Sequence, residues 1–112
     1  MNSLGVIGGL GPMATAYLLE LITDMTDART DQEHLDAIIF NRPSVPDRTA
    51  YILDHTKPSP VPPMIDIAQK LEALGVCALA TPCVTAHSFH DELQSSVHIC
   101  LLYTSDAADE AR

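Results

Sequence analysis

The chain has 112 residues, which suits one compact domain and is short for a two-domain enzyme. Hydrophobic residues make up 46% of it and charged residues 19%, which indicates a globular core rather than a disordered chain. The formal net charge of −9 would repel a phosphate backbone, so nucleic acid is not an expected partner, and an anionic ligand would need a site built locally from arginines and helix N-termini.

The N-terminal segment MNSLGVIGGLGP lacks the basic region and the long apolar run of a signal peptide. Glu20 and Asp24 interrupt the longest candidate for a membrane span. Three cysteines without an export signal are typical of reduced thiols. We therefore expect a soluble, cytoplasmic protein that does not engage a membrane.

The first expected elements are a strand, a glycine turn and a helix. Leu4 to Ile7 is a short apolar run that ends at Gly8 and Gly9, which is typical of a buried strand stopping at a tight turn. Pro12 then occupies a position common at the start of a helix. The apolar residues that recur at helical spacing after it are Ala14, Tyr17, Leu18, Leu21, Ile22 and Met25.

A second strand is expected at Ala37–Phe40. Pro43 and Pro46 favour extended backbone after it, and Asp47 is the expected N-cap of a short helix through Leu53. The loop after this strand presents Arg42, Ser44 and Arg48.

The remaining chain again alternates helices and strands. Residues 55–63, HTKPSPVPP, form a proline-rich connector, and a second amphipathic helix is expected to begin at Met64 and to end with Gly75 as its C-cap. The residues expected on its buried face are Ile65, Ala68, Leu71 and Leu74. A third strand is expected at Val76–Ala80, a third helix at Thr85–Leu93 and a weak fourth strand at Val97–Ile99.

This alternation predicts an α/β fold: a three-layer parallel-sheet lobe of flavodoxin-like or Rossmann-like type, with helices on both faces. Ligands of such sheets bind beyond the carboxyl ends of the strands. Three segments are expected to converge there, namely GGLGPMAT, NRPSVPDR and TPCVTAH.

The glycine turn fits the pattern G-x-G-x-x-A from Gly9 onward, which is found in dinucleotide-binding loops. However, Pro12 removes one backbone donor, and the second strand ends in Asn41 where an acidic ribose ligand would be expected. We therefore favour a tight turn that lets the backbone approach some other anion.

Cys83 lies just beyond the third strand, at the start of the expected third helix. A lone cysteine is usually a small buried residue, and we expect this of Cys77. A helix N-terminus favours the thiolate, however, which can act as a base towards a bound carbon acid or as a nucleophile. Cys83, His87 and His90 could also hold zinc, but their spacing matches no familiar zinc pattern, so solvated or core histidines are expected and no metal site is assigned.

Arg48 could be a solvated surface residue. It lies on a loop expected to converge with Cys83, in a chain with only six lysines and arginines, so binding a carboxylate is at least as well supported.

The last segment, CLLYTSDAADEAR, departs from this pattern. Through Glu110 it resembles a translated reading frame of a common transposase sequencing-library adaptor. We therefore expect residues 1–99 to form the N-terminal lobe and residues 100–112 to be a non-native tail, with a genuine disordered acidic tail as the alternative.

The segments GVIGGLGPMATA, DQEH, IIFNRPSVPDRTAYIL and TPCVTAH together resemble the aspartate/glutamate racemase family. The resemblance runs from Leu4 to about Ile99. It implies two similar α/β lobes with the active site between them, commonly in a homodimer, of which this chain supplies the first lobe. It also implies a cofactor-independent reaction, without pyridoxal phosphate or metal, in which one cysteine removes the α-proton and an opposed cysteine delivers a proton to the other face.

By the same resemblance Cys83 is the first catalytic cysteine. Thr85 looks like a contact to a substrate carboxylate, and Arg48 is similar to the arginine that receives the side-chain carboxylate. Met13 and Asn41 occupy motif positions that line the pocket.

Val84 stands where the family usually has Asn, so one polar substrate contact is lost. The second cysteine and a lysine of the other lobe are absent from this chain. The intact parent is therefore expected to racemise aspartate or glutamate, and the 112-residue chain alone is not. The alternatives are a related isomerase or decarboxylase of small dicarboxylic acids, and a non-catalytic fragment that binds a small carboxylate.

Overall fold

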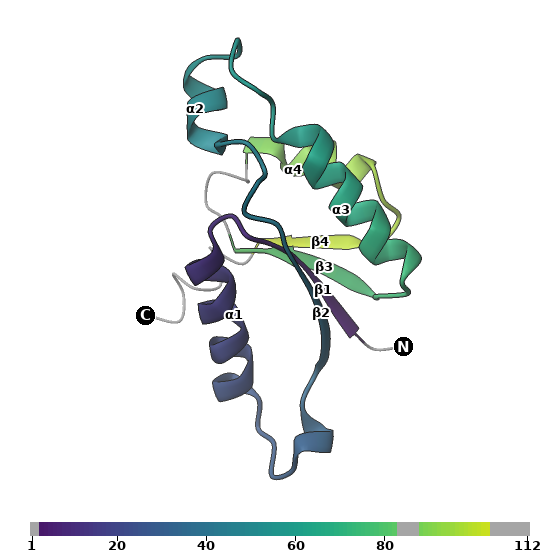
Figure 1. The fold of residues 1–112 in the computed structure, drawn as a ribbon. Helices are drawn as coiled ribbons and strands as arrows, with labels where there is room; N and C mark the ends of the chain where they lie inside the picture. The colour runs from purple at the N-terminus through teal and green to yellow at the C-terminus, as the bar shows by residue number, and fades with distance from the viewer. Residues whose placement is uncertain (1–2, 83–87, 104–112) are drawn as a thin grey trace.

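The computed structural model of the chain describes residues 3–82 and 88–103. Its centre is a sheet of four parallel strands in the order β2-β1-β3-β4 (Figure 1). The strands are β1 (Ser3–Gly8), β2 (Asp36–Asn41), β3 (Ala78–Thr81) and β4 (Cys100–Tyr103). The predicted α/β fold with a parallel sheet is confirmed.

The helices lie on both faces of this sheet. Helix α1 (Pro12–Met25) lies on one face, and α3 (Val61–Ala73) and α4 (His90–Ser95) lie on the other (Figure 1). The short helix α2 (Arg48–Leu53) lies beyond the carboxyl ends of the strands, and a 3-10 turn, η1 (Asp31–Glu33), precedes β2. Within the described ranges, no helix combines the length and the apolar character needed to cross a membrane.

The hydrophobic core lies between the sheet and α3 and α4. Its most enclosed side chains have no exposed surface: Ile7 and Leu79 from the sheet, Met64, Ile67 and Leu71 from α3, and Leu93 from α4. The other face differs, because Thr15 is the one buried residue of α1. The core is therefore concentrated on one side of the sheet.

Several predicted ends of elements are confirmed. Helix α1 begins at Pro12, and Asp47 caps α2 because its carboxylate accepts a hydrogen bond from the Ala50 amide at 3.1 Å. Gly75 follows the end of α3 with φ +94°, a left-handed conformation that favours glycine, and donates its amide hydrogen to the Glu72 carbonyl.

The start of α3 was predicted wrongly. The helix begins at Val61 rather than Met64, so that Pro62 and Pro63 lie in its first turn. Proline is tolerated there because the first amides of a helix have no partner within the helix. The predicted buried face is also shifted: Leu74, just past the last helical residue, is 57% exposed.

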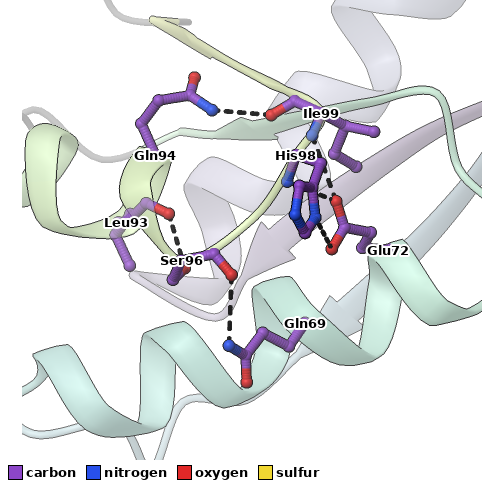
Figure 2. Close-up of polar contacts among 7 residues, drawn as sticks. All are labelled: Gln69, Glu72, Leu93, Gln94, Ser96, His98 and Ile99. Atoms are coloured by element: carbon purple, nitrogen blue, oxygen red, sulfur yellow. Dashed lines mark hydrogen bonds and ion pairs between the residues drawn. The ribbon is translucent and has the colours of Figure 1, made fainter.

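The two elements at the end of the fold also differ from the prediction. Helix α4 is His90–Ser95 and so ends two residues after the predicted end at Leu93, while the predicted start at Thr85 lies outside the described residues. Strand β4 is Cys100–Tyr103 instead of Val97–Ile99. The Glu72 carboxylate accepts the amide hydrogens of His98 at 2.6 Å and Ile99 at 3.2 Å, and Gln94 binds the Ile99 carbonyl at 2.8 Å (Figure 2). Side chains of α3 and α4 thus form hydrogen bonds with backbone groups that a strand at Val97–Ile99 would need for pairing with its neighbour.

Cys77 is a further correction. We expected it in the core of the third strand, but β3 begins one residue later and Cys77 is exposed. Its thiol donates a hydrogen bond to the Ser3 carbonyl at 3.1 Å.

Candidate active site

The loops that follow β1 and β2 are packed directly against each other at the carboxyl edge of the sheet. The Arg42 amide donates to the Gly8 carbonyl at 3.0 Å. Gly9 has φ +94°, and a β-carbon there would lie 2.4 Å from the Arg42 carbonyl carbon and 2.6 Å from the Pro43 nitrogen. Glycine is therefore required by the contact between two loops, which explains this position without a bound anion.

Thr15 is a residue at this edge of the sheet whose part in the glycine loop sequence reasoning missed. It is 4% exposed, and its hydroxyl accepts the Gly9 amide hydrogen at 2.9 Å and donates to the Gly11 carbonyl at 3.1 Å. The Gly9 donor that an anion-binding turn would offer is thus used inside the loop. A polar residue within the apolar spacing of α1, one turn after Pro12, was the available signal.

Arg48 is the first residue of α2. One of its terminal nitrogens, Nη1, donates to the carbonyls of Val45 and Pro46, at 3.4 Å each. Its Nε is buried and has no hydrogen-bond partner within the described part of the chain. The loop therefore holds the guanidinium from one side and leaves donors for an acceptor such as a carboxylate.

The other arginine of this loop is differently placed. Nη1 of Arg42 pairs with the Asp66 carboxylate at 3.4 Å, which also receives the Lys70 ammonium at 2.9 Å. The hydrogen bond from Lys70 lowers the pKa of Asp66, and the charge of Arg42 adds to this shift. Arg48, in contrast, forms no ion pair with any residue that the structure describes. Of the two arginines, Arg48 is the one whose charge is not already matched.

Two further predicted site residues lie at the same edge. Asn41 ends β2 and is paired in register with Gly8, and Met13, in the first turn of α1, is 80% exposed. The structure places Met13, Asn41 and Arg48 around the carboxyl edge of the sheet. Cys83, Val84 and Thr85 lie outside the described residues.

Comparisons with known proteins identify the family to which this chain belongs. The sequence profile of the Asp/Glu/Hydantoin racemase family matches residues 7–111. The chain belongs to this family. The broad specificity amino-acid racemase RacX of Bacillus subtilis (strain 168) is 29% identical to it over 104 residues, which are 89% of this chain and 44% of that relative.

Solved racemase structures have the same fold. Picrophilus torridus aspartate racemase matches with a TM-score of 0.82 and 33% identity, over 92% of this chain and 43% of that protein. An aspartate racemase homologue from Pyrococcus horikoshii OT3 matches with a TM-score of 0.76 and 21% identity, over 99% of this chain and 48% of that protein, a likeness of fold. This racemase-family chain thus spans just under half the length of these relatives.

The segment that follows β3 in this racemase-family chain is tied to α2 and to β4. Phe89 is 5% exposed, and its ring lies 6.1 Å, centre to centre, from the ring of Tyr51 on α2. Nε2 of His90 is 3.0 Å from the Leu101 carbonyl, which can only accept, so this ring nitrogen carries a hydrogen. Phe89 and His90, just beyond the third predicted segment, are thus held against α2 and β4.

His90 bears on the zinc alternative. In the part of the chain that the structure describes, no group of three or more His, Cys, Asp or Glu side chains could hold a metal ion. The other two residues of that alternative, Cys83 and His87, lie outside the described residues.

Proposed function

We propose that this chain is one half of a pyridoxal-phosphate-independent amino-acid racemase that acts on aspartate or glutamate. The observation that carries the proposal is the state of Arg48: a half-buried guanidinium at the carboxyl edge of the sheet, with a buried unpartnered Nε and no ion pair in the described structure. Membership of the racemase family supports the reaction class. The names of RacX and of the Picrophilus torridus enzyme support an amino acid as the substrate.

The proposed reaction begins with electrostatic recognition. The substrate is a dianion with one ammonium group, and this chain carries a net charge of −9, so attraction must come from local groups. Arg48 receives the side-chain carboxylate through charge-assisted hydrogen bonds, and Thr85 contacts the other carboxylate. Met13 and Asn41 line the pocket. Val84 supplies no hydrogen bond, which affects substrate affinity or choice.

The proton transfer uses two thiols on opposite faces of the α-carbon. The Cys83 thiolate takes the α-proton, and the electron pair of the broken C–H bond stays on the substrate, delocalised into the adjacent carboxylate. A thiol of the other half then gives its proton to the opposite face of this carbon. Nothing is oxidised or reduced, and no cofactor or metal takes part in the proposed step.

One thiol can remove a proton but cannot deliver one to the opposite face. The racemase activity therefore belongs to the intact parent, in which a second lobe supplies the other cysteine. We place this enzyme in the cytoplasm, where thiols stay reduced; Cys77 and Cys100 are both free and exposed.

The test uses the intact parent, whose sequence long-read sequencing of the source DNA beyond the Ile99 codon would provide. The enzyme is incubated with aspartate or glutamate in deuterated water, and both α-deuterium and the opposite enantiomer are measured. Racemisation requires the α-deuterium content and the amount of the opposite enantiomer to rise together. An α-carbon that stays protonated, with no opposite enantiomer formed, would instead favour the isomerase or decarboxylase alternative and refute the proposal.

Arg42, in the loop after β2, and Arg48, the first residue of α2, make a matched pair for the binding step. Arg48→Lys is expected to raise KM for the dicarboxylic amino acid about tenfold, because lysine lacks the planar fork of donors of a guanidinium. A tenfold rise corresponds to a loss of about 1.4 kcal/mol of binding free energy. Arg42→Lys is expected to change KM by less than about twofold, since Arg42 pairs with Asp66. Equal effects of the two substitutions would contradict the role given to Arg48.

A further inference from the structure

Helix α2 carries Arg48 but is weakly attached to the rest of the fold. It has six residues, buries none of them and lies beyond the carboxyl ends of the strands (Figure 1). Isolated helices of this length are unstable in water, so the position of α2 depends on its contacts with other elements. Two of its apolar side chains give little such contact, since Leu53 is 81% exposed and Ile52 is 38% exposed.

Tyr51 is the side chain through which α2 meets the hydrophobic core. It is partly buried and packs against the core cluster, and its ring lies 6.1 Å, centre to centre, from the Phe89 ring, with the ring planes at 45°. Such a separation is typical of paired aromatic side chains. The His55 ring, in the turn just after α2, meets the Tyr51 ring edge-on at 4.6 Å. Tyr51 therefore joins α2 to the core.

Phe89 gives Tyr51 a fixed partner. It is 5% exposed, belongs to the core cluster and immediately precedes α4. Leu93 of α4 has no exposed surface, and Nε2 of His90 lies 3.0 Å from the Leu101 carbonyl of β4. The start of α4 is thus anchored to both the core and the sheet, so a ring that packs on Phe89 takes its position from the body of the fold.

Arg48 lies on the same side of α2 as Tyr51, because residues three apart in a helix are neighbours on its surface. Its Nη1 donates to the carbonyls of Val45 and Pro46, in the loop before the helix, at 3.4 Å each. Both hydrogen bonds are long, so they hold the guanidinium only weakly. The direction of the guanidinium therefore depends also on where the backbone of α2 lies.

We infer that Tyr51 is a positioning residue for Arg48. The packing of its ring on Phe89 sets where α2 lies, and thereby the direction in which the Arg48 donors meet an acceptor. The inference rests on the proposed function only for the identity of that acceptor, a substrate carboxylate. Tyr51 takes no part in the proton transfer, so its loss weakens substrate binding more than turnover.

NMR of the 112-residue chain tests the placement of Arg48 without a substrate. The Arg48 Nε–H is buried, so its hydrogen is expected to exchange slowly with water. In Tyr51→Leu, which removes the ring but keeps an apolar side chain, this exchange is expected to accelerate about tenfold because α2 opens more often. Tyr51→Phe keeps the ring and is expected to exchange as the parent chain does. Leu53→Ala is the matched control on the exposed side of the same helix.

A second site and a second variant separate positioning from general destabilisation. The Leu79 amide, in the core strand β3, is expected to exchange at the same rate in the parent chain and in Tyr51→Leu, whereas a weakened fold would accelerate it as well. Phe89→Leu removes the other ring and is expected to speed the Arg48 exchange similarly. Unchanged Arg48 exchange in both variants, or equal acceleration at Arg48 and Leu79 in Tyr51→Leu, would overturn the inference.

Kinetics of the intact parent then test the consequence for substrate binding. Tyr51→Leu is expected to raise KM for the dicarboxylic amino acid about fivefold while kcat changes by less than about twofold, and Tyr51→Phe is expected to keep the parental KM. A parent that does not racemise would refute the proposed function, and the Arg48 exchange would then decide the inference alone. A parent that racemises with the same KM in Tyr51→Leu would overturn the inference and leave the proposed function standing.

Discussion

Gly9 is the residue on which the contact between the first two loops depends. Gly9→Ala is expected to lower the free energy of unfolding by about 1–3 kcal/mol, because φ is +94° and the new β-carbon would meet the Arg42–Pro43 backbone. Urea denaturation measures the change. Gly11→Ala is the control, since a β-carbon at Gly11 has no neighbour within 4 Å and φ is −94°. Comparable losses in the two variants would show that the loop contact is not the cause.

The glycine turn could be predicted from the sequence, but the contacts that require glycine in it could not. A glycine pair after an apolar run indicates a tight turn whichever partner approaches it. The backbone that approaches Gly9 belongs to Arg42 and Pro43, which are remote in the sequence, and the threonine that takes its amide hydrogen is Thr15. The contact with Arg42 and Pro43 depends on how β1 and β2 pair, and local spacing does not encode that.

At the scale of elements, Asp47 organises the short helix that carries Arg48. Asp47→Ala is expected to remove the cap and to cost about 1 kcal/mol locally, since α2 has only six residues. Amide exchange by NMR reports this at Ala50, the donor to the Asp47 carboxylate, where exchange is expected to accelerate about fivefold. Asp47→Asn keeps an accepting oxygen and is expected to exchange nearly as the parent does. Unchanged exchange in the alanine variant would refute the cap.

Glu72 joins α3 to the segment that leads into β4 (Figure 2). The hydrogen bond from the His98 amide is the main cause that lowers the pKa of Glu72, and partial burial opposes it. Because the folded-state pKa lies below that of the unfolded chain, this stabilisation is present above the ordinary pKa of a glutamate. It is lost as the pH falls through the lowered pKa of the folded state.

The melting temperatures of the parent and of Glu72→Gln are therefore expected to differ most near neutral pH. The difference should shrink as the solution is acidified through the range where Glu72 becomes protonated. Glu92→Gln, which removes the same charge from an exposed position of α4, controls for the general effect of net charge. A difference in melting temperature that stays constant from neutral to acidic pH would contradict the claim that the ionised Glu72 carboxylate stabilises the fold.

The same contacts explain which elements could be predicted. Strands β1, β2 and β3 lie within two residues of their predicted ends, because short apolar runs between turn residues mark buried strands well. The start of β4 moved from Val97 to Cys100 because Glu72 and Gln94 bind the backbone before it, and no local pattern shows such long-range capping. The prediction that residues 100–112 are a non-native tail stays open to the sequencing experiment. In the fold, residues 100–103 form the edge strand β4.

At the scale of the whole molecule, the proposed function makes this chain one side of an active site that two lobes share. Its four-stranded sheet brings Met13, Asn41 and Arg48 to one edge, and it spans just under half the length of its racemase relatives. The fold and the family could be predicted because each of the short motifs combines a strand end with loop residues, and the motifs follow one another in a characteristic order along the chain. That Thr15 is the one buried residue of α1 could not be predicted from the helical spacing of the apolar residues in this helix.

The most direct measurement is a chiral assay of the purified 112-residue chain with L-aspartate and, separately, D-aspartate. Chiral chromatography follows the appearance of the opposite enantiomer, with Cys83→Ala and Cys77→Ala variants run beside the parent chain. If the chain is one half of a two-thiol racemase, no interconversion is expected in any of the three proteins. Interconversion by the 112-residue chain that is lost in Cys83→Ala and kept in Cys77→Ala would contradict the requirement for a second lobe.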